Sequence, residues 1–252
     1  AIEGVEDRLH VRSAVRQIAV IVVDGEEVGV FAEPRDSDAT ITSIGAEKRD
    51  GTPVLTGTAS IGPDYGETEI ERRLARLRPS DQLVILSDLV VGQKGAANPE
   101  DVIMDFDQNM GQLYPFSLNE KLASITEPHP YYTGTDNPWG KPVIPLEMIS
   151  VLTQYSGSNT GFKTKGPAVG LFAGQELRLI NGPLFVNHDY QLEREIIALS
   201  ESRRTESTWI RTSVFDTATR DLVAEVILTS ATLKDSYANY AEDAAALGKT
   251  LD

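Results

Sequence analysis

The stretch that decides the expected fold is LEMISVLTQY, residues 146–155. Its apolar side chains fall on most sides of a helix, and a helix of that kind is buried in a core instead of lying on a surface. Pro145 precedes it and suits the first helical turn, because the N–H that proline lacks would have no partner there. A helix this apolar needs a sheet curled around it to remove it from water. The stretch therefore predicts an α+β protein with a central buried helix.

The chain after this helix predicts long antiparallel strands. Apolar and β-branched residues dominate four runs, over residues 169–180, 190–202, 206–215 and 221–233. Asn181-Gly182-Pro183 is a turn signal between the first two runs, and residues 217–220 supply the last turn. The tail, residues 236–247, is alanine-rich and acidic, and we expect it to form an exposed helix.

The beginning of the chain predicts a similar antiparallel meander. Strands are expected over residues 11–23, 27–31, 39–47 and 53–61, with Asp50-Gly51 setting the register of the last hairpin. Residues 67–79 predict a helix whose acidic residues come first and whose arginines come last, as the helix dipole favours. The two ends of the chain therefore look like two copies of one unit. The alternative is that any two antiparallel meanders look alike, and both interpretations stay open.

Between the two meanders, residues 82–91 predict a strand and residues 92–118 are loop-rich, as in a lid or linker. Residues 118–125 predict a short helix. The expected organisation is a first unit at residues 1–80, a linker and lid-like segment at 81–128, and a second unit with the central helix at 129–252. The first unit shows no central helix of its own, so that helix is either lost or lies upstream of Ala1.

The charge balance indicates which partners to expect. Lys and Arg number 23 and Asp and Glu 38, so the formal net charge is -15. An acidic protein repels phosphate backbones and anionic lipid surfaces, which argues against nucleic acid and membrane partners. An anionic ligand would need a local basic patch.

Cysteine and histidine usage limits the chemistry. The chain has no cysteine, which excludes disulfides, thiol catalysis and thiolate metal sites and fits a cytoplasmic protein. The three histidines, His10, His129 and His188, lack the spacing of metal ligands. No apolar run approaches the length of a membrane helix, and no signal peptide is visible. We expect no metal and no cofactor.

The lead-in GKPVIP, residues 140–145, followed by a buried helix and a long-strand meander, resembles the MaoC-like, R-specific (type-2) enoyl-CoA hydratases and dehydratases. The resemblance covers most of residues 80–240, and the first unit matches only as a meander. It implies a double hot-dog fold, in which long antiparallel sheets wrap a central buried helix. It also implies a lyase and a homodimer, since hot-dog sheets usually extend across a two-fold axis.

The catalytic signature of that family is Asp-x-Asn-Pro-x-His, shortly before the lead-in. One register places TDNPWG, residues 135–140, on the signature, but Gly140 already begins the lead-in and no spacer remains. The preferred register uses EPHPYY, residues 127–132. Glu127 then stands for Asp, His129 for Asn and Tyr132 for His, while Pro130 is kept. These departures count against ordinary enoyl-CoA hydration.

Hydration of a conjugated carbonyl needs an activated water and a proton donor on the same face. In the preferred register we expect Glu127 to act as the base, His129 as the proton shuttle, and Tyr132 as a hydrogen-bond or proton donor. Glu147, in the first turn of a buried helix, is either stabilised by the helix dipole or part of the site. The resemblance also implies that N–H groups at this helix start polarise the substrate carbonyl. The expected substrate-binding residues are Tyr131, Asn137, Trp139, Gly140 and Val143.

Structural interpretations of the same residues stay open. His129 is alternatively a loop histidine satisfied by backbone, and Tyr131 and Tyr132 are alternatively core or interface aromatics. Asp136-Asn137 is alternatively only a turn, and His188 is expected to open a strand.

The leading functional hypothesis is a hydratase or dehydratase acting on a conjugated carbonyl compound. If the substrate is a coenzyme A thioester, its phosphates must meet basic residues, for which the candidates are Lys163, Lys165, Arg203, Arg204 and Arg211. One alternative is a catalytically silent hot-dog protein that binds a ligand or serves as a partner subunit. Another is a thioesterase that uses Glu147. The expected partners are a small-molecule substrate and a second copy of the chain.

Overall fold

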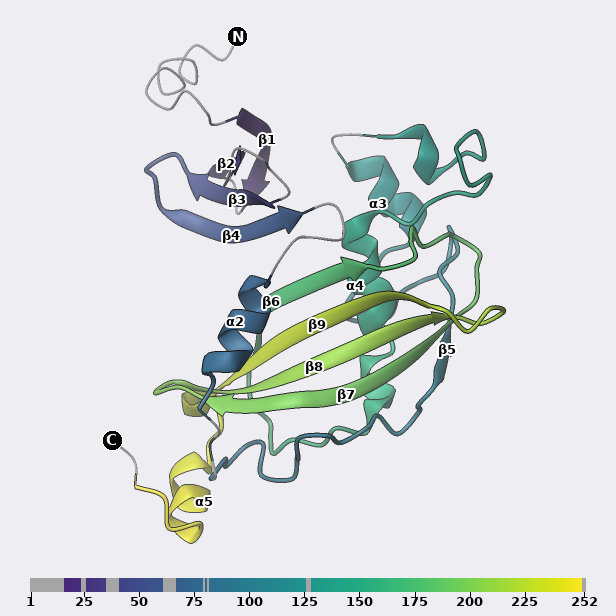
Figure 1. The fold of residues 1–252 in the computed structure, drawn as a ribbon. Helices are drawn as coiled ribbons and strands as arrows, with labels where there is room; N and C mark the ends of the chain where they lie inside the picture. The colour runs from purple at the N-terminus through teal and green to yellow at the C-terminus, as the bar shows by residue number, and fades with distance from the viewer. Residues whose placement is uncertain are drawn as a thin grey trace. The chain divides into compact units, whose positions relative to one another are not determined.

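The computed structural model describes residues 16–23, 26–34, 41–60, 67–78, 80, 82–125 and 128–250 (Figure 1). The chain divides into two units, residues 1–76 and residues 77–252. Residues 82–125, which include most of the stretch expected to be a linker and lid, therefore belong to the second unit.

The first unit contains a four-stranded antiparallel sheet whose strands are neighbours in chain order. Its strands are β1 (Arg16–Val23), β2 (Glu26–Pro34), β3 (Ile41–Lys48) and β4 (Pro53–Ser60), and α2 (Glu69–Arg76) follows. At the β3–β4 turn Gly51 has a φ of 86°, and the Asp50 carboxylate accepts the N–H of Thr52 at 2.9 Å. The predicted hairpin and helix are confirmed. Residues 11–15 of the first expected strand lie outside the described residues.

The second unit is built on a five-stranded antiparallel sheet with the strand order β5-β7-β8-β9-β6. Its strands are β5 (Glu100–Val102), β6 (Gly170–Leu179), β7 (Tyr190–Glu201), β8 (Thr205–Asp216) and β9 (Leu222–Leu233). Side chains alternate between the two faces along β7, where Tyr190, Leu192, Arg194 and Ile196 are buried and the three residues between them are less so. The four long strands predicted after the helix are confirmed.

Helix α4 (Leu146–Gln154) packs on one face of this sheet (Figure 1). Met148, Ile149 and Leu152 are almost fully buried, with at most 1% of each exposed. The same apolar cluster includes Leu192 of β7, Val214 of β8 and Val226 of β9, and Leu177 of β6 packs against it. Long antiparallel strands around one buried helix make the hot-dog arrangement, so the α+β fold class expected from residues 146–155 is confirmed. The start of the helix is its most exposed part, where Leu146 is 61% exposed.

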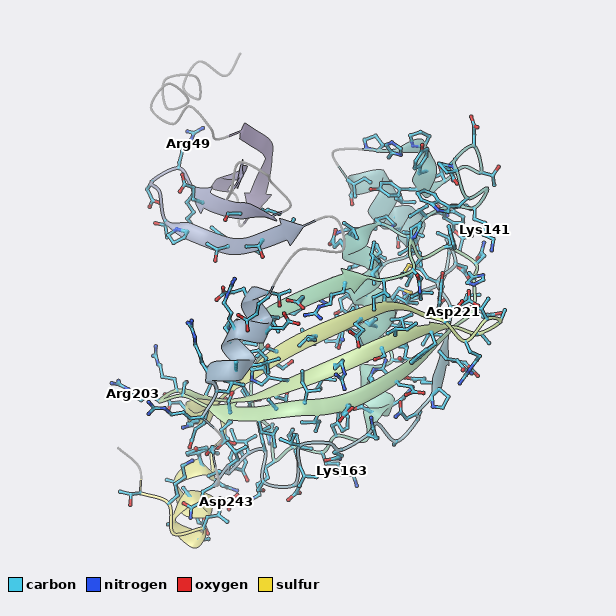
Figure 2. All side chains as sticks on the ribbon, in the orientation of Figure 1. Arg49, Lys141, Lys163, Arg203, Asp221 and Asp243 are labelled. Atoms are coloured by element: carbon cyan, nitrogen blue, oxygen red, sulfur yellow. The ribbon has the colours of Figure 1, made fainter. Side chains whose placement is uncertain are left out.

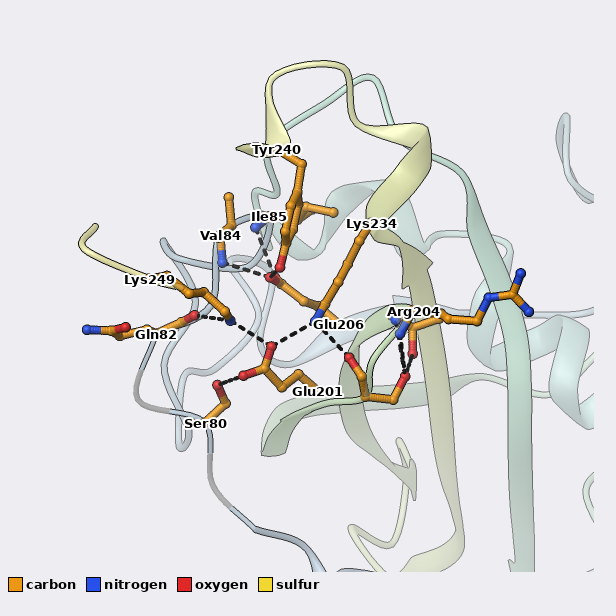
Figure 3. A network of polar contacts seen from close by, with 12 residues as sticks. Ser80, Gln82, Val84, Ile85, Glu201, Arg204, Glu206, Lys234, Tyr240 and Lys249 are labelled. Atoms are coloured by element: carbon orange, nitrogen blue, oxygen red, sulfur yellow. Dashed lines mark hydrogen bonds and ion pairs between the residues drawn. The ribbon is translucent and has the colours of Figure 1, made fainter. Parts of the chain in front are cut away.

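The strand predicted over residues 82–91 is wrong. Leu83, Val84, Ile85 and Leu86 are buried, as their apolar character indicates, but they form turns and pair with no strand. Their backbone is satisfied by a carboxylate instead: Glu206 of β8 accepts the N–H groups of Val84, Ile85 and Leu86 at 2.8, 2.9 and 3.1 Å (Figure 3). A buried backbone N–H needs a hydrogen-bond partner. Here the Glu206 side chain supplies the acceptor that a neighbouring β-strand would otherwise supply.

The tail forms the predicted helix, α5 (Tyr240–Ala246), which is exposed along much of its surface as predicted but buries one face. Tyr240 and Ala244 are buried in a second apolar cluster with Leu83–Leu86, Leu89 and Ile196. The Tyr240 hydroxyl also donates to Glu206 at 2.9 Å. Alanine is small enough for the helix to approach the core closely, so an alanine-rich composition does not by itself indicate exposure.

Candidate functional site

The loop that follows helix α3 (Leu118–Ser124) carries the predicted catalytic residues His129 and Tyr132, and Glu147 lies in the first turn of α4. α3 starts with a capping box: the Ser117 hydroxyl accepts the N–H of Glu120 at 3.2 Å, and Glu120 accepts the N–H of Ser117 at 2.7 Å. This reciprocal pair satisfies two N–H groups at the helix start. Leu118 is fully buried and joins α3 to the α4 cluster.

A short 3-10 turn, Pro130–Tyr132, places His129 and Tyr132 beside the end of α3. A hollow of about 320 Å³ lies between these elements. Leu122 and Ile125 of the α3 segment line it, and across from them lie Pro128, His129, Pro130, Tyr132 and Thr133. Two of the predicted catalytic residues, His129 and Tyr132, therefore share one hollow. Glu127, the predicted base, lies outside the described residues.

The hydrogen bonding of His129 defines the chemistry of its ring. Its Nδ1 accepts the N–H of Tyr131 at 3.2 Å and so caps the 3-10 turn. In the neutral ring the proton must then reside on Nε2. A neutral His129 held in this way can donate a hydrogen bond from Nε2–H to a carbonyl oxygen.

Glu147 does not stand alone at the start of α4. Its carboxylate forms an ion pair with Lys121 of α3, with 2.7 Å between Oε1 and Nζ. The Lys121 ammonium also lies 5.7 Å from the ring centre of Phe116. Glu147 is 65% exposed and Lys121 27% exposed, and such a pair contributes little to stability. What it does supply is a tether between α3 and the first turn of α4.

The five predicted binding residues belong to the adjoining loop and do not line the hollow. The Asn137 amide is occupied within the loop: its Nδ2 donates to the carbonyl oxygens of Gly134 and Lys141 at 3.1 and 2.8 Å, and its Oδ1 accepts the N–H of Trp139 at 3.0 Å. Gly140 has a φ of 65°. Asn137 therefore has a structural role in this loop, whatever else it contacts.

Tyr131, Trp139 and Val143 connect this loop to its surroundings. The Val143 N–H donates to the Tyr131 carbonyl oxygen at 2.8 Å. The rings of Tyr131 and Trp139 meet edge to face, with 6.2 Å between centres, and Tyr131 meets His129 at 4.4 Å. Trp139 is 46% exposed. These contacts place the rings of Tyr131 and Trp139 beside the hollow. Tyr131 connects Trp139 to His129, which lines the hollow.

The basic residues considered for a thioester lie away from the hollow. Figure 2 shows Arg203, in the β7–β8 turn, at the opposite end of the second unit from Lys141. Lys165 pairs with Asp243 at 2.9 Å, and Arg211 pairs with Glu195 at 3.0 Å. Lys121 is a basic residue beside the hollow, since its chain neighbour Leu122 lines it.

One ion pair at this end of the unit was not predicted. His188 Nε2 lies 2.5 Å from Asp216 Oδ2, and the ring of His188 meets that of Tyr190 at 4.9 Å. The other Asp216 oxygen accepts the N–H groups of Ala218 and Thr219 at 2.8 and 2.9 Å. Burial opposes ionisation of Asp216, but these hydrogen bonds lower its pKa. No sequence signal links residues 188 and 216, because the pair exists only once β8 and the 181–189 loop have folded.

Three further observations concern other kinds of site. A second hollow, of about 300 Å³, lies over β7, β8 and β9, and its charged residues include the ion-paired Lys94, Glu195 and Arg211. Within the part of the chain that the structure describes, no group of three or more His, Asp or Glu residues is arranged to hold a metal. In that same part, none of the helices has the length and apolar character needed to span a membrane.

Comparison with known proteins yields similarity of fold. No protein-family model matches the sequence, and no curated protein matches it. The structure is similar to a MaoC-like dehydratase from Rhodospirillum rubrum, at 12% identity over 60% of this chain and 97% of that one, with a TM-score of 0.43. It is also similar to the (R)-hydratase of A. caviae involved in PHA biosynthesis, at 17% identity over 56% and 96% of the two chains, with a TM-score of 0.37.

A third similar structure is a conserved protein of Mycobacterium tuberculosis with a double hot-dog fold. It shares 10% identity over 87% of this chain and 68% of its own, with a TM-score of 0.42. The resemblance to MaoC-like dehydratases and double hot-dog proteins, first seen in residues 140–145, is confirmed as a likeness of fold. At such identities the likeness concerns the fold alone.

Proposed function

We propose that the chain is a hydro-lyase that adds water to, or removes it from, a carbon–carbon double bond next to a carbonyl group. The observation that carries the proposal is that His129 and Tyr132 line one hollow of about 320 Å³. Such a reaction needs donors and a base on one face of a small, mostly apolar substrate. The hollow supplies both kinds of surface, apolar from α3 and polar from the 128–133 loop.

In this proposal the Nε2–H of His129 holds the substrate carbonyl oxygen and stabilises the negative charge that develops there. The Tyr132 hydroxyl delivers a proton to the α-carbon during hydration, and Glu127 takes a proton from the attacking water. Glu147 acts through Lys121 as a positioning residue.

The test is hydration of crotonyl thioesters, measured as loss of the conjugated enoyl absorbance. We would assay both crotonyl-CoA and crotonyl-N-acetylcysteamine. His129→Asn keeps a side-chain acceptor for the Tyr131 N–H but removes the Nε2 donor, and it should lower kcat by about 100-fold or more. His188→Gln is the matched control, because His188 pairs with Asp216 and does not line the hollow.

A catalytically silent ligand-binding protein is the alternative. It is favoured by the departures from Asp-x-Asn-Pro-x-His and by the apolar lining of the hollow from Leu122, Ile125 and the two prolines. A thioesterase needs a free carboxylate near the helix, and the pairing of Glu147 with Lys121 works against it. The ligand-binding alternative predicts that the chain binds butanoyl thioesters but neither hydrates enoyl thioesters nor hydrolyses acyl thioesters. That result would contradict the lyase.

We also propose that the chain is a cytoplasmic homodimer. β6 is the last strand in the sheet order, and its segment exposes apolar side chains: Leu171 at 46%, Phe172 at 64% and Leu179 at 43%. An apolar edge strand is a template for pairing with another strand. Light scattering of the parent chain and of Phe172→Lys tests this, with a dimer expected for the first and a monomer for the second.

A further inference from the structure

Helix α4 is shorter than the sheet face that it covers. β7, β8 and β9 have 12 residues each, which corresponds to roughly 40 Å of strand. α4 has nine residues and is about 13 Å long. Part of the face therefore needs another cover. There Ile196 is buried in a second apolar cluster, against which Leu199 and Ile210 pack, and the described members of this cluster include no residue of α4.

Two segments from opposite ends of the second unit contribute to this cluster. One contains Leu83–Leu86 and Leu89, and the other is α5, which contributes Tyr240 and Ala244. Figure 1 shows α5 at one end of the unit, apart from α4. Undocking of α5 would therefore expose apolar side chains of residues 83–89 to water, while the α4 cluster would keep its own cover.

α5 has few interactions of its own that keep it helical. It has seven residues, and the side chain of its N-cap residue, Asn239, makes no capping hydrogen bond. A helix this short does not persist in water by itself. Only Tyr240 and Ala244 of α5 are buried, far fewer than the buried residues of β9. Because α5 depends on docking, its local opening needs less free energy than unfolding of the sheet.

Asp243 holds α5 to the rest of the unit. Its Oδ2 accepts hydrogen bonds from the Tyr237 hydroxyl and from the Lys165 ammonium, both at 2.9 Å. The backbone N–H of Lys165 donates to the Ile85 carbonyl oxygen at 2.9 Å, so Lys165 links α5 to the segment beside it. The Lys165 side chain is 33% exposed and that of Asp243 27% exposed, so dissolved salt weakens their attraction.

Lys249 holds the chain that follows α5. Its Nζ donates to the Gln82 carbonyl oxygen and to Glu201 Oε2, both at 2.6 Å (Figure 3). Among the described residues, the backbone–backbone hydrogen bonds of residues 237–250 stay within residues 234–250. Side chains alone therefore hold this segment to the rest of the unit, and it can leave without breaking a strand ladder.

From these observations we propose that residues 237–250 form a clasp that opens as one unit while the sheet and α4 stay folded. The open clasp uncovers the second apolar cluster, and the closed clasp hides it. The ion pairs of Asp243 and Lys249 thus control whether the chain presents an apolar surface, and salt or the loss of either pair favours the open state. The clasp does not depend on the proposed hydro-lyase activity.

Single thiols test the proposal directly, because the chain has no cysteine. Ala244 in α5 and Ala224 in β9 are both completely buried, so a cysteine at either position reacts only after its surroundings open. With excess 5,5′-dithiobis(2-nitrobenzoate), Ala244→Cys should react about 100-fold or more faster than Ala224→Cys, because local opening needs less free energy than unfolding. About 1 M KCl should speed the reaction of Ala244→Cys about threefold.

Asp243→Asn, added to Ala244→Cys, should speed the reaction about fivefold, because it removes the ion pair with Lys165. The same change added to Ala224→Cys should have almost no effect. Glu242→Gln is the matched control: it removes the neighbouring carboxylate of α5, which is exposed and forms no ion pair with any described residue. It should change the rate of Ala244→Cys by less than about twofold.

Equal reaction rates for the two cysteines would show that α5 opens only when the sheet unfolds, and they would overturn the proposal. An Ala244→Cys rate that neither salt nor Asp243→Asn changes would do the same. Hydrogen exchange of the parent chain decides the matter if circular dichroism shows a cysteine variant to be unfolded. The α5 amides should exchange together and faster than those of β8, and exchange of both at one rate would overturn the clasp.

Discussion

The Tyr240 hydroxyl donates a hydrogen bond to the Glu206 carboxylate at 2.9 Å, across 34 residues of sequence. Glu206 is fully buried, and the same carboxylate accepts three successive backbone N–H groups from Val84, Ile85 and Leu86 (Figure 3). Burial and the hydrogen bond to Glu206 raise the pKa of Tyr240. One side chain of β8 thus holds both the segment that begins the second unit and the helix that ends it.

Replacing Glu206 by Ala should lower the free energy of unfolding by about 3 kcal/mol or more, because three buried N–H groups would lose their partner. Tyr240→Phe should cost about 1 to 2 kcal/mol, since it removes one hydrogen bond to a charged acceptor. Urea denaturation of both single variants and the double variant measures the coupling. Additive effects would contradict a direct interaction between the two side chains.

A second buried network should respond in the same way. Arg194, with 2% of its side chain exposed, pairs with Glu100 of β5 and donates from Nη2 to the Thr153 carbonyl oxygen and the Ser156 hydroxyl, both at 2.9 Å. Arg194→Met should cost about 2 to 4 kcal/mol, because it leaves the largely buried Glu100 carboxylate without its charged partner, with only Ser156 and Asn159 donating to it. The double variant with Glu100→Gln should recover part of that loss in urea denaturation.

The control for this network is Arg211→Met on the other face of the same sheet. Arg211 is 41% exposed and pairs with Glu195 at 3.0 Å. An exposed pair is worth less than about 1 kcal/mol, so this variant should be close to the parent. Similar losses for Arg194→Met and Arg211→Met would show that the burial of the first pair has no energetic consequence.

The fold was largely predictable because its signals are local. Residues 146–155 are apolar on most sides, which predicts a buried helix wherever the sheet lies. The strands predicted over residues 190–202 and 221–233 match β7 and β9 to within one residue at each end. The run at 82–91 failed for a non-local reason. Periodicity reports burial correctly there, but the hydrogen-bond partner of its backbone is Glu206, about 120 residues away.

The candidate site divides along the same line. His129 and Tyr132 were found through a motif of six residues, and the structure places both beside one hollow. Leu122 and Ile125, which form the other wall, carry no motif and look like ordinary helix residues. The Lys121–Glu147 pair joins two helices that are separated by the whole 125–145 segment, so charge pattern within either helix could not indicate it.

Glu201 makes the stability of the second unit dependent on pH. Burial opposes its ionisation, but hydrogen bonds from Lys249, Ser80 and Lys234 outweigh burial and lower the pKa of Glu201 from 4.5 to about 2. A carboxyl group with a depressed pKa in the folded state stabilises the fold above its unfolded pKa, and that stabilisation is lost as the pH falls through the folded value. The pH window is therefore from about 4.5 down to about 2.

Glu201→Gln should accordingly be less stable than the parent by about 1 to 2 kcal/mol at pH 6, because solvent reaches this carboxylate and screens its ion pairs. The difference should shrink as the pH falls below about 4.5 and nearly vanish near pH 2. Guanidinium denaturation at several pH values, with constant ionic strength, gives the two curves. A difference that stays constant between pH 6 and pH 2 would mean that the Glu201 carboxylate is not held ionised by its three partners.

The loop between the hollow and α4 should depend on the backbone conformation of Gly140. Its φ of 65° lies in the left-handed region, and a Cβ built there meets nothing within 4 Å. Gly140→Ala should therefore cost about 1 kcal/mol through backbone strain alone, with no steric contribution.

Gly170→Ala at the start of β6 is the matched control, because its Cβ also meets nothing but its φ lies outside the left-handed range. That variant should be neutral or slightly stabilising, since alanine restricts the unfolded chain more than glycine does. Equal urea midpoints for the two variants would mean that the 137–140 turn accommodates alanine without backbone strain, which would contradict this prediction.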